Sequence, residues 1–142
     1  MEKESQKTIL IVDDEPHITL SMEYLFEDEG CNVIKADNSE DAVNMIKDKK
    51  PDLVILDIMM PRSKETAGNI IRDEGVRICK EIKANDDKSI SGIPIILLSV
   101  KAKSIDVPDD LGAEKVFVKP FNSEALISCV KEILESKKEN RS

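Results

Sequence analysis

Five side chains that could act together in catalysis stand directly after apolar runs of the sequence. Asp13 and Asp14 follow the run TILIV, and Asp57 follows LVIL. Ser99 follows IPIILL, and Lys119 follows VFV. An ionised carboxylate at the end of a buried run is costly unless a cation or hydrogen-bond donors compensate its charge. If the fold brings these side chains together, the acids, the hydroxyl and the ammonium form one polar site.

The elements that must position these residues follow from the hydrophobic pattern. Apolar runs typical of strands cover residues 8–12, 32–36, 53–56, 93–98 and 116–118. Between them, apolar residues recur at helical spacing over 17–29, which Gly30 ends, and after Asn38, which is a favourable N-cap. A third helix ends near Asn85, supported by Ile71 and by later isoleucines, and a last helix begins after Asn122.

Strands that alternate with helices form right-handed crossovers, which give a parallel sheet covered on both faces. We therefore predict an α/β fold, a doubly wound five-stranded parallel sheet flanked by helices on both faces. One domain covers residues 1–136, with a long loop or helix extension at about 62–75. Residues 137–142 are predicted to be a polar tail or the start of a linker.

Composition narrows the class of protein. The formal net charge of −8 argues against direct binding to nucleic acid or to an anionic membrane. No apolar run approaches the roughly 20 residues of a membrane span, and the polar start lacks the apolar segment of a secretory signal. Cys31, Cys79 and Cys129 are far apart, which favours free thiols over a disulfide or a metal site. We expect a cytoplasmic location.

In open parallel sheets, sites form beyond the carboxyl ends of the strands. Three acids gathered there repel one another, so that without a cation at least one pKa should rise. A set of carboxylate oxygens suits Mg²⁺, and Lys119 adds a second positive charge. Mg²⁺ and a lysine can neutralise the oxygens of a phosphoryl group in transfer, while the Ser99 hydroxyl donates a hydrogen bond. Asp57 can then act as the nucleophile and form an acyl phosphate.

Each residue also has a simpler interpretation when it is taken alone. The acidic pair could be a charge cluster at a helix N-terminus, and Asp57 could be a turn residue. Ser99 could be a loop hydroxyl, and Lys119 a surface charge. It is their joint placement at successive strand ends that favours a functional site.

The motifs ILIVDDEP, LVILDIMMP, IPIILLS and VFVKPF, in this order, resemble those of the receiver domains of two-component response regulators. The resemblance implies the flavodoxin-like receiver fold, with Asp57 as the phosphoacceptor. It implies Mg²⁺ held by Asp14, Asp57 and the backbone carbonyl of Met59, with Asp13 acting through water. It further implies that Ser99 is the switch hydroxyl, and that Lys119 pairs with the phosphoryl group and precedes a cis peptide bond to Pro120.

The same resemblance implies partners. The phosphoryl donor is a sensor histidine kinase or a phosphotransfer protein, and the output goes to an unknown downstream protein, with a homodimer as a further expectation. Membrane and nucleic acid are not expected as direct partners, and no output domain follows in this chain. The domain is expected to catalyse only its own phosphorylation and slow dephosphorylation, and so it is not classed as an enzyme.

Three departures from the family pattern affect these expectations. The segment of residues 61–75 is longer than in the family pattern. Three interpretations are open: it lengthens the third helix at its N-terminal end, it forms a separate lid, or it is a tolerated surface insertion. The segment between Ser99 and Gly112 is short and contains Pro108, which predicts a short, broken or mobile fourth helix. The position of the usual switch aromatic is Val116, with Phe117 beside it.

Other functions remain open on sequence grounds. A phosphorylation-independent interaction module is favoured by Val116 and by the short fourth helix, and opposed by the intact polar set. A Mg²⁺-dependent phosphatase with an aspartyl nucleophile typically has a second acid two residues later, where this chain has Met59. A nucleotide-binding flavodoxin-like protein is disfavoured because no glycine-rich phosphate loop follows the first strand.

Overall fold

The computed structural model describes residues 6–100 and 110–140. Its strands are β1 (Thr8–Val12), β2 (Asn32–Ala36), β3 (Leu53–Asp57), β4 (Met60–Pro61), β5 (Ile70–Ile71), β6 (Ile95–Val100) and β7 (Lys115–Lys119). Its helices are α1 (Pro16–Asp28), α2 (Ser39–Lys49), the 3₁₀ turn η1 (Lys64–Thr66), α3 (Glu74–Lys83), α4 (Lys88–Ser91) and α5 (Ser123–Asn140). The alternation of strand and helix predicted from the sequence is thus confirmed.

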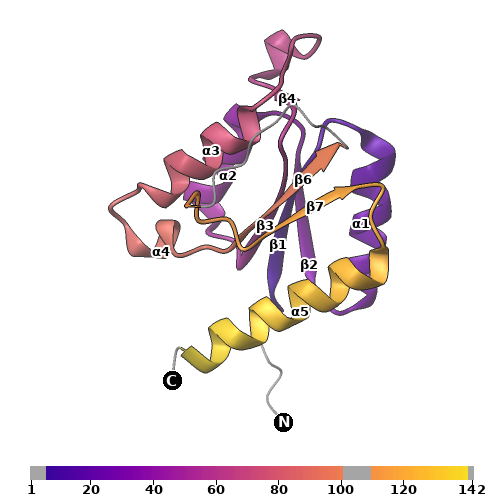
Figure 1. Ribbon diagram of the computed structural model, residues 1–142, viewed down its shortest axis with the longest axis vertical. Helices are drawn as coiled ribbons and strands as arrows, with labels where there is room; N and C mark the ends of the chain where they lie inside the picture. The colour runs from indigo at the N-terminus through magenta and orange to yellow at the C-terminus, as the bar shows by residue number, and fades with distance from the viewer. Residues whose placement is uncertain (1–5, 101–109, 141–142) are drawn as a thin grey trace.

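The main sheet has five parallel strands in the order β2-β1-β3-β6-β7. The chain leaves β1 toward one edge to form β2 and then crosses back to form β3 on the other side. The strand order therefore reverses between β1 and β3, which is where open α/β sheets place their sites. Figure 1 shows the helices on both sides of this sheet.

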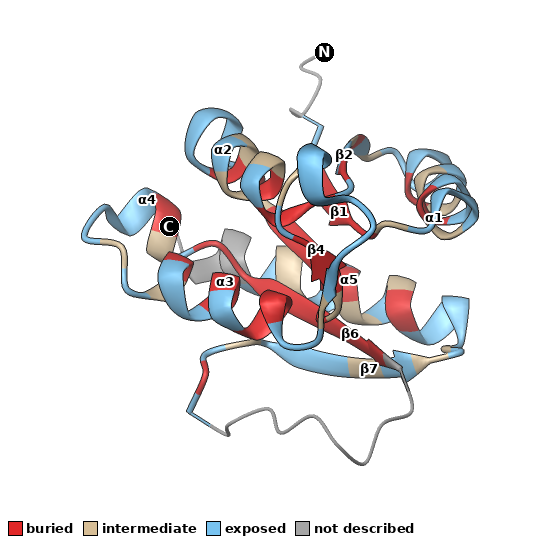
Figure 2. Cartoon of the chain, turned by 90° about the horizontal axis from the view of Figure 1, so that it is seen from above, coloured by how far each residue is buried: buried red, intermediate tan, exposed pale blue. Residues whose placement is uncertain are grey.

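Two apolar clusters cover the two faces of the sheet. Alternate residues of β1 face opposite ways, so that Leu10 packs with α2 and α3 while Ile11 packs with α1 and α5. All four apolar residues of β3 are fully buried, and Figure 2 shows the central strands enclosed between the helix layers. Burial on both faces explains why β3 is a continuous apolar run and does not alternate with polar residues.

Helix ends follow local signals in the sequence. The Asn38 side chain accepts a hydrogen bond from the backbone N–H of Asp41 at 2.9 Å and caps α2. Gly30 adopts φ of +88° directly after the α1 C-cap, a conformation that glycine takes without strain. Among the described residues, no helix is long and apolar enough to cross a membrane.

The structure differs from the predicted bounds at several places. The third helix ends at Lys83, and the strand predicted at 93–98 spans Ile95–Val100. Helix α5 continues to Asn140, so residues 137–140 are helical although we predicted a polar tail from residue 137. The short helix α4 was not predicted. The predicted short or broken helix with Pro108 lies outside the described residues.

The insertion at 61–75 does not lengthen the third helix, because α3 begins only at Glu74. The expectation that Ile71 belongs to that helix was wrong. Strands β4 and β5 instead pair antiparallel, with Pro61 opposite Ile70, and η1 lies between them. Figure 1 shows this β4–β5 ribbon standing out beyond the edge of the sheet at which β3 ends.

Candidate functional site

The register of the sheet brings the predicted site residues to one edge. Val12 pairs with Leu56, so Asp13 lies level with Asp57 on the neighbouring strand. Asp57 in turn pairs with Leu98, which places Ser99 one residue further along β6. These positions belong to the carboxyl ends of β1, β3 and β6, as the sequence predicted.

The Lys119 ammonium at the end of β7 lies between two of the carboxylates. Its Nζ donates to Asp13 Oδ2 at 2.9 Å and to Asp57 Oδ2 at 3.0 Å, with a longer contact of 3.4 Å to Glu15 Oε1. The Asp13 and Asp57 side chains are buried, and that of Lys119 is only 11% exposed. Lys119 is therefore the cation that compensates the buried acids, and the simpler interpretation as a surface charge was wrong.

One ammonium does not fully neutralise this cluster. Burial raises the pKa of the Asp57 carboxyl to about 6; the charge of Asp13 adds to the rise and Lys119 opposes it. Burial, and next the charge of Asp13, also raises the pKa of Asp14. Burial alone would lower the pKa of Lys119, but its hydrogen bond to Asp13 and the charge of Asp57 outweigh it and raise that pKa. The lysine stays charged, and the acids retain an excess of negative charge.

The acids fit a divalent cation. Asp13, Asp14 and Asp57 each offer a carboxylate oxygen, and these atoms lie within 4.8 Å of one another. An all-oxygen set with unrelieved negative charge suits Mg²⁺ better than a softer metal. A cavity of about 410 Å³ opens beside Asp13 and Asp14, with Lys64 of the insertion on its lining. The residues present thus fit the ion that the sequence suggested, with space beside two of the acids.

The loop after Asp57 has a defined shape. The backbone N–H of Met59 donates to Asp57 Oδ1 at 3.2 Å, so the two oxygens of this carboxylate have different donors, Met59 at Oδ1 and Lys119 at Oδ2. Met59 is partly buried, and the role of its carbonyl as a metal ligand stays a prediction. Ser99 is buried at the end of β6, and its role as the switch hydroxyl also stays a prediction. The peptide bond between Lys119 and Pro120 is cis, as the resemblance implied.

The aromatic side chain next to the usual switch position does not replace it. Val116 is 37% exposed on one side of β7. Phe117 points to the opposite side, as neighbouring strand residues do, and packs on the cluster of α1 and α5. Its ring contacts that of Phe121 edge to face, with centroids 6.4 Å apart. The ring that a hydroxyl-to-aromatic relay needs is therefore absent from position 116.

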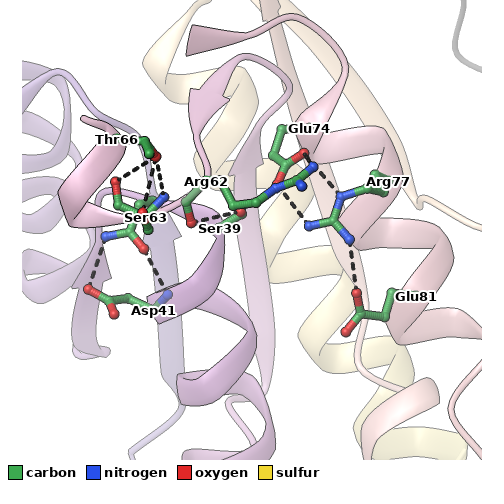
Figure 3. Close-up of polar contacts among 9 residues, drawn as sticks. Ser39, Asp41, Arg62, Ser63, Thr66, Glu74, Arg77 and Glu81 are labelled. Carbon is green, nitrogen blue, oxygen red and sulfur yellow. Dashed lines mark hydrogen bonds and ion pairs between the residues drawn. The ribbon is translucent and has the colours of Figure 1, made fainter. Parts of the chain in front are cut away.

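Sequence reasoning missed a second charged cluster close to the site. Glu74, the first residue of α3, is completely buried and contacts Ser39, Arg62 and Arg77 (Figure 3). A carboxylate at a helix start next to an arginine at spacing three was the available signal, but it is common on helix surfaces. Its burial depends on the insertion, whose path the pattern did not predict.

Comparison with known proteins agrees with this geometry. The model of the response regulator receiver domain family matches residues 9–131. The alkaline phosphatase synthesis transcriptional regulatory protein PhoP of Bacillus subtilis (strain 168) is 33% identical over 130 residues, which are 90% of this chain and 48% of that protein. The chain thus spans about half the length of this curated relative.

Two solved structures are similar as well. The signal receiver domain of a signal transduction histidine kinase from Syntrophus aciditrophicus is 30% identical, with a TM-score of 0.77 over 92% of this chain and 91% of that one. A CheY-like response regulator receiver domain protein from Methanospirillum hungatei JF-1 is 25% identical, with a TM-score of 0.79 over 96% and 99% of the two chains. The chain belongs to the response regulator receiver domain family of two-component signalling systems.

Proposed function

We propose that this receiver domain is a phosphorylation-controlled signalling switch in which Asp57 accepts a phosphoryl group. The observation that carries the proposal is the contact of one buried lysine with two buried aspartates, at 2.9 Å and 3.0 Å, beside a third aspartate. This arrangement combines a nucleophile, a fixed positive charge and an oxygen set for Mg²⁺ at one sheet edge. Such a site stabilises a transferring phosphoryl group by position and charge.

The proposed donor is a phosphohistidine of a sensor histidine kinase or of a phosphotransfer protein. A carboxylate oxygen of Asp57 attacks phosphorus, the bond from phosphorus to the imidazole nitrogen breaks, and its electron pair stays on that nitrogen. The product is an acyl phosphate on Asp57. Lys119 already faces the Asp57 carboxylate and can pair with the incoming phosphoryl oxygens, while Ser99 is the proposed donor to one of them.

Mg²⁺, when bound, would neutralise charge on the phosphoryl oxygens. Asp14, Asp57 and the Met59 carbonyl are the proposed direct ligands, and Asp13 the proposed ligand through water. We further propose that the domain turns over no substrate other than its own phosphoryl group. A cytoplasmic location, a protein as downstream target and a possible homodimer complete the proposal.

A second candidate is an interaction module that works without phosphorylation. The observation in its favour is Val116, because a relay from Ser99 to a rotating aromatic ring needs a ring at that position. In this case, the fold and the polar site would be retained while the output depends on surfaces alone. The two candidates differ in one simple property, the capacity of Asp57 to become phosphorylated.

The test is the intact mass of the protein after incubation with a small acyl phosphate and Mg²⁺. We expect one added phosphate on the wild type, none without Mg²⁺ and none on Asp57→Asn. Asp86→Asn is the matched control, because Asp86 is an exposed aspartate between α3 and α4, and it should behave as the wild type. A folded wild-type protein that binds Mg²⁺ and still takes no phosphate from small or protein donors would favour the interaction module.

A further inference from the structure

We call Asp13, Asp14, Asp57 and Lys119 the acid site. Glu74 carries a buried charge outside this site, and hydrogen-bond donors surround its carboxylate. Arg62 donates to Oε2 from Nε and to Oε1 from Nη2, both at 3.2 Å. Arg77 donates to Oε1 from Nε at 3.0 Å and to Oε2 from Nη2 at 2.8 Å. The Ser39 hydroxyl lies 2.5 Å from Oε2, and Figure 3 shows these groups converging on one carboxylate. We call Ser39, Arg62, Glu74 and Arg77 the Glu74 cluster.

The Glu74 cluster joins both ends of the insertion to α2. Arg62 directly follows β4, whereas Glu74 begins α3, so their ion pair closes the segment between them into a loop with fixed ends. The carbonyl of Arg62 accepts from the backbone N–H of Glu40 at 2.8 Å, and the Ser39 hydroxyl lies 3.1 Å from the same carbonyl. The single hydroxyl proton serves the shorter contact to Glu74. The N-terminus of α2 is thus a fixed support for the insertion.

The next residue, Gly75, connects the Glu74 cluster with the loop after Asp57, residues 57–59. Its backbone N–H donates to the carbonyl of Ile58 at 2.8 Å. A Cβ at Gly75 would lie only 2.3 Å from the carbonyl oxygen of Asp57, so the helix start touches the backbone of the loop. From the other side, the Ile58 N–H donates to Leu98 of β6 at 2.9 Å. The backbone after Asp57 is therefore held between β6 and the first turn of α3.

Stability alone is a poor reason for this arrangement. An ion pair with one buried partner is seldom more stable than well-packed apolar side chains of the same volume, because the buried carboxylate loses its hydration even where Arg62 and Arg77 stay 56% and 45% exposed. What a charged cluster offers is directional contact, since each guanidinium binds the carboxylate through two N–H groups in a fixed plane. The Glu74 cluster is thus better explained by the geometry that it fixes, and that geometry is the position of the α3 N-terminus.

We propose that Glu74 is a positioning residue, whose carboxylate fixes the start of α3 and thereby the backbone of residues 57–59 that binds Mg²⁺ and presents the phosphoacceptor. This inference rests on the proposed function. Without the Glu74 charge, Asp57 stays at the end of β3, and Asp13 and Asp14 stay directly after β1. The loop after Asp57 loses its support, and the carbonyl of Met59 no longer has one position. The two residues at the base of the insertion, Arg62 and Glu74, then support the phosphoacceptor site, and this role does not depend on the exposed residues 64–70.

The test is Glu74→Gln, which keeps the size of the side chain and removes its charge. Without Mg²⁺, we expect amide hydrogen exchange of Gly75 to become roughly ten-fold faster, since its hydrogen bond to Ile58 opens more often. Titration calorimetry should find Mg²⁺ binding weaker by about ten-fold, as for other groups that orient metal ligands. Phosphorylation by a small acyl phosphate should return toward the wild-type rate at saturating Mg²⁺. Amide exchange in β1 and β3 should stay at the wild-type rate, because general damage to the fold would speed exchange there as well.

Glu81→Gln is the matched control, because Glu81 also binds Arg77, at 3.2 Å, but is 41% exposed and distant in sequence from the loop. This variant should change neither the exchange rate of the Gly75 amide nor the affinity for Mg²⁺. If Glu74→Gln does not fold, Arg62→Gln takes its place, because it removes one donor to Glu74 and the Arg62 side chain is 56% exposed. It should likewise speed exchange of the Gly75 amide and weaken Mg²⁺ binding. Wild-type affinity for Mg²⁺ in the folded variant would overturn the inference and leave the proposed function intact. A wild-type protein that binds no Mg²⁺ would instead overturn the proposed function itself.

Discussion

A single residue of the acid site, Asp57, is held where its charge lowers the stability of the fold. Asp57 is buried beside Asp13, and its raised pKa indicates that the fold disfavours its charge even with Lys119 in contact. Asp57→Asn removes that charge and keeps an oxygen that can accept from Lys119. Without Mg²⁺ at neutral pH, we expect this variant to be more stable than the wild type by about 1–3 kcal/mol, measured by urea unfolding.

The comparison with Asp52→Asn separates this effect from a general gain on removing an acid. Asp52 precedes β3, and its carboxylate accepts from the backbone N–H of Thr8 at 2.8 Å. Asn keeps an oxygen that can accept this hydrogen bond but loses the charge that strengthens it, so this variant should be less stable than the wild type by up to about 1 kcal/mol. An Asp57→Asn variant that is less stable than the wild type in EDTA would mean that the pairing with Lys119 outweighs burial and repulsion.

Gly75 is a residue whose lack of a side chain is required by packing. In Gly75→Ala, the new Cβ would lie 2.3 Å from the Asp57 carbonyl oxygen and 2.7 Å from Ile58 Cα, both backbone atoms that cannot rotate away. We expect a loss of about 1–3 kcal/mol in unfolding free energy, larger than the gain from the higher helix propensity of alanine. Gly68→Ala is the control, because nothing lies within 4 Å of its added Cβ. Equal stability of the two variants would contradict the close contact.

Glu74 also makes stability depend on pH. Burial alone would raise its pKa, but the hydrogen bonds from Arg77 and Arg62 outweigh burial and lower it to about 2, with Ser39 adding to the effect. A carboxyl with a lowered pKa stabilises the fold fully above its ordinary pKa of 4.5, and this stabilisation is lost as the pH falls toward 2.

The corresponding experiment is urea unfolding of the wild type and of Glu74→Gln between pH 7 and pH 3. The wild-type advantage that depends on the charge is of the order of 3 kcal/mol above pH 5, and roughly half of it should be lost at about pH 3. A difference between the two proteins that stays constant over this range would show that the Glu74 charge does not contribute.

At the scale of elements, the insertion divides into a fixed base and an exposed end. Residues 64–70 are all exposed, whereas Pro61 at the start of the ribbon is buried and Glu74 closes its base. We expect that replacing residues 64–69 by Asn-Gly changes unfolding free energy by no more than about 0.5 kcal/mol, because surface loops contribute little and shorter loops close at a lower entropy cost. Phosphorylation by a small acyl phosphate should remain at the wild-type rate.

A control for this replacement is Arg62→Ala, which leaves the exposed end intact and removes one contact of the Glu74 cluster. It should slow phosphorylation at limiting Mg²⁺, and the loop replacement should not. A slower reaction in the shortened protein would assign the exposed end, including Lys64 on the cavity beside Asp14, to the site as well.

Elements also explain which parts of the site were predictable from sequence. Strand ends are local features, so once alternating elements indicate a parallel sheet, Asp13, Asp57 and Lys119 must meet at one edge. The Glu74 cluster depends on a different kind of information. Arg62 reaches Glu74 only because β4 and β5 pair and return the chain, and two-residue strands leave almost no pattern in the sequence.

At the scale of the whole molecule, ion binding and folding are linked. A ligand that binds only the native state stabilises it, by about 2.7 kcal/mol at a hundred times its dissociation constant. The acid site is formed by β1 and β3, which lie far apart in the unfolded chain, so Mg²⁺ should raise the melting temperature of the wild type. Because the net charge is −8, any salt also relieves general repulsion, and the comparison must be made at equal ionic strength with Na⁺.

The variants give this measurement its specificity. Asp57→Asn and Asp14→Asn each remove a proposed Mg²⁺ ligand and should lose most of the stabilisation that is specific to Mg²⁺. This loss should occur in Asp57→Asn even though we expect that variant to be more stable than the wild type in EDTA. Glu74→Gln should need about ten-fold more Mg²⁺ for the same rise in melting temperature. Stabilisation of Asp14→Asn equal to that of the wild type would mean that the ion acts on the acidic surface as a whole. In that case, no Mg²⁺ would bind specifically at Asp13, Asp14 and Asp57, and Lys119 would be the cation that compensates these carboxylates.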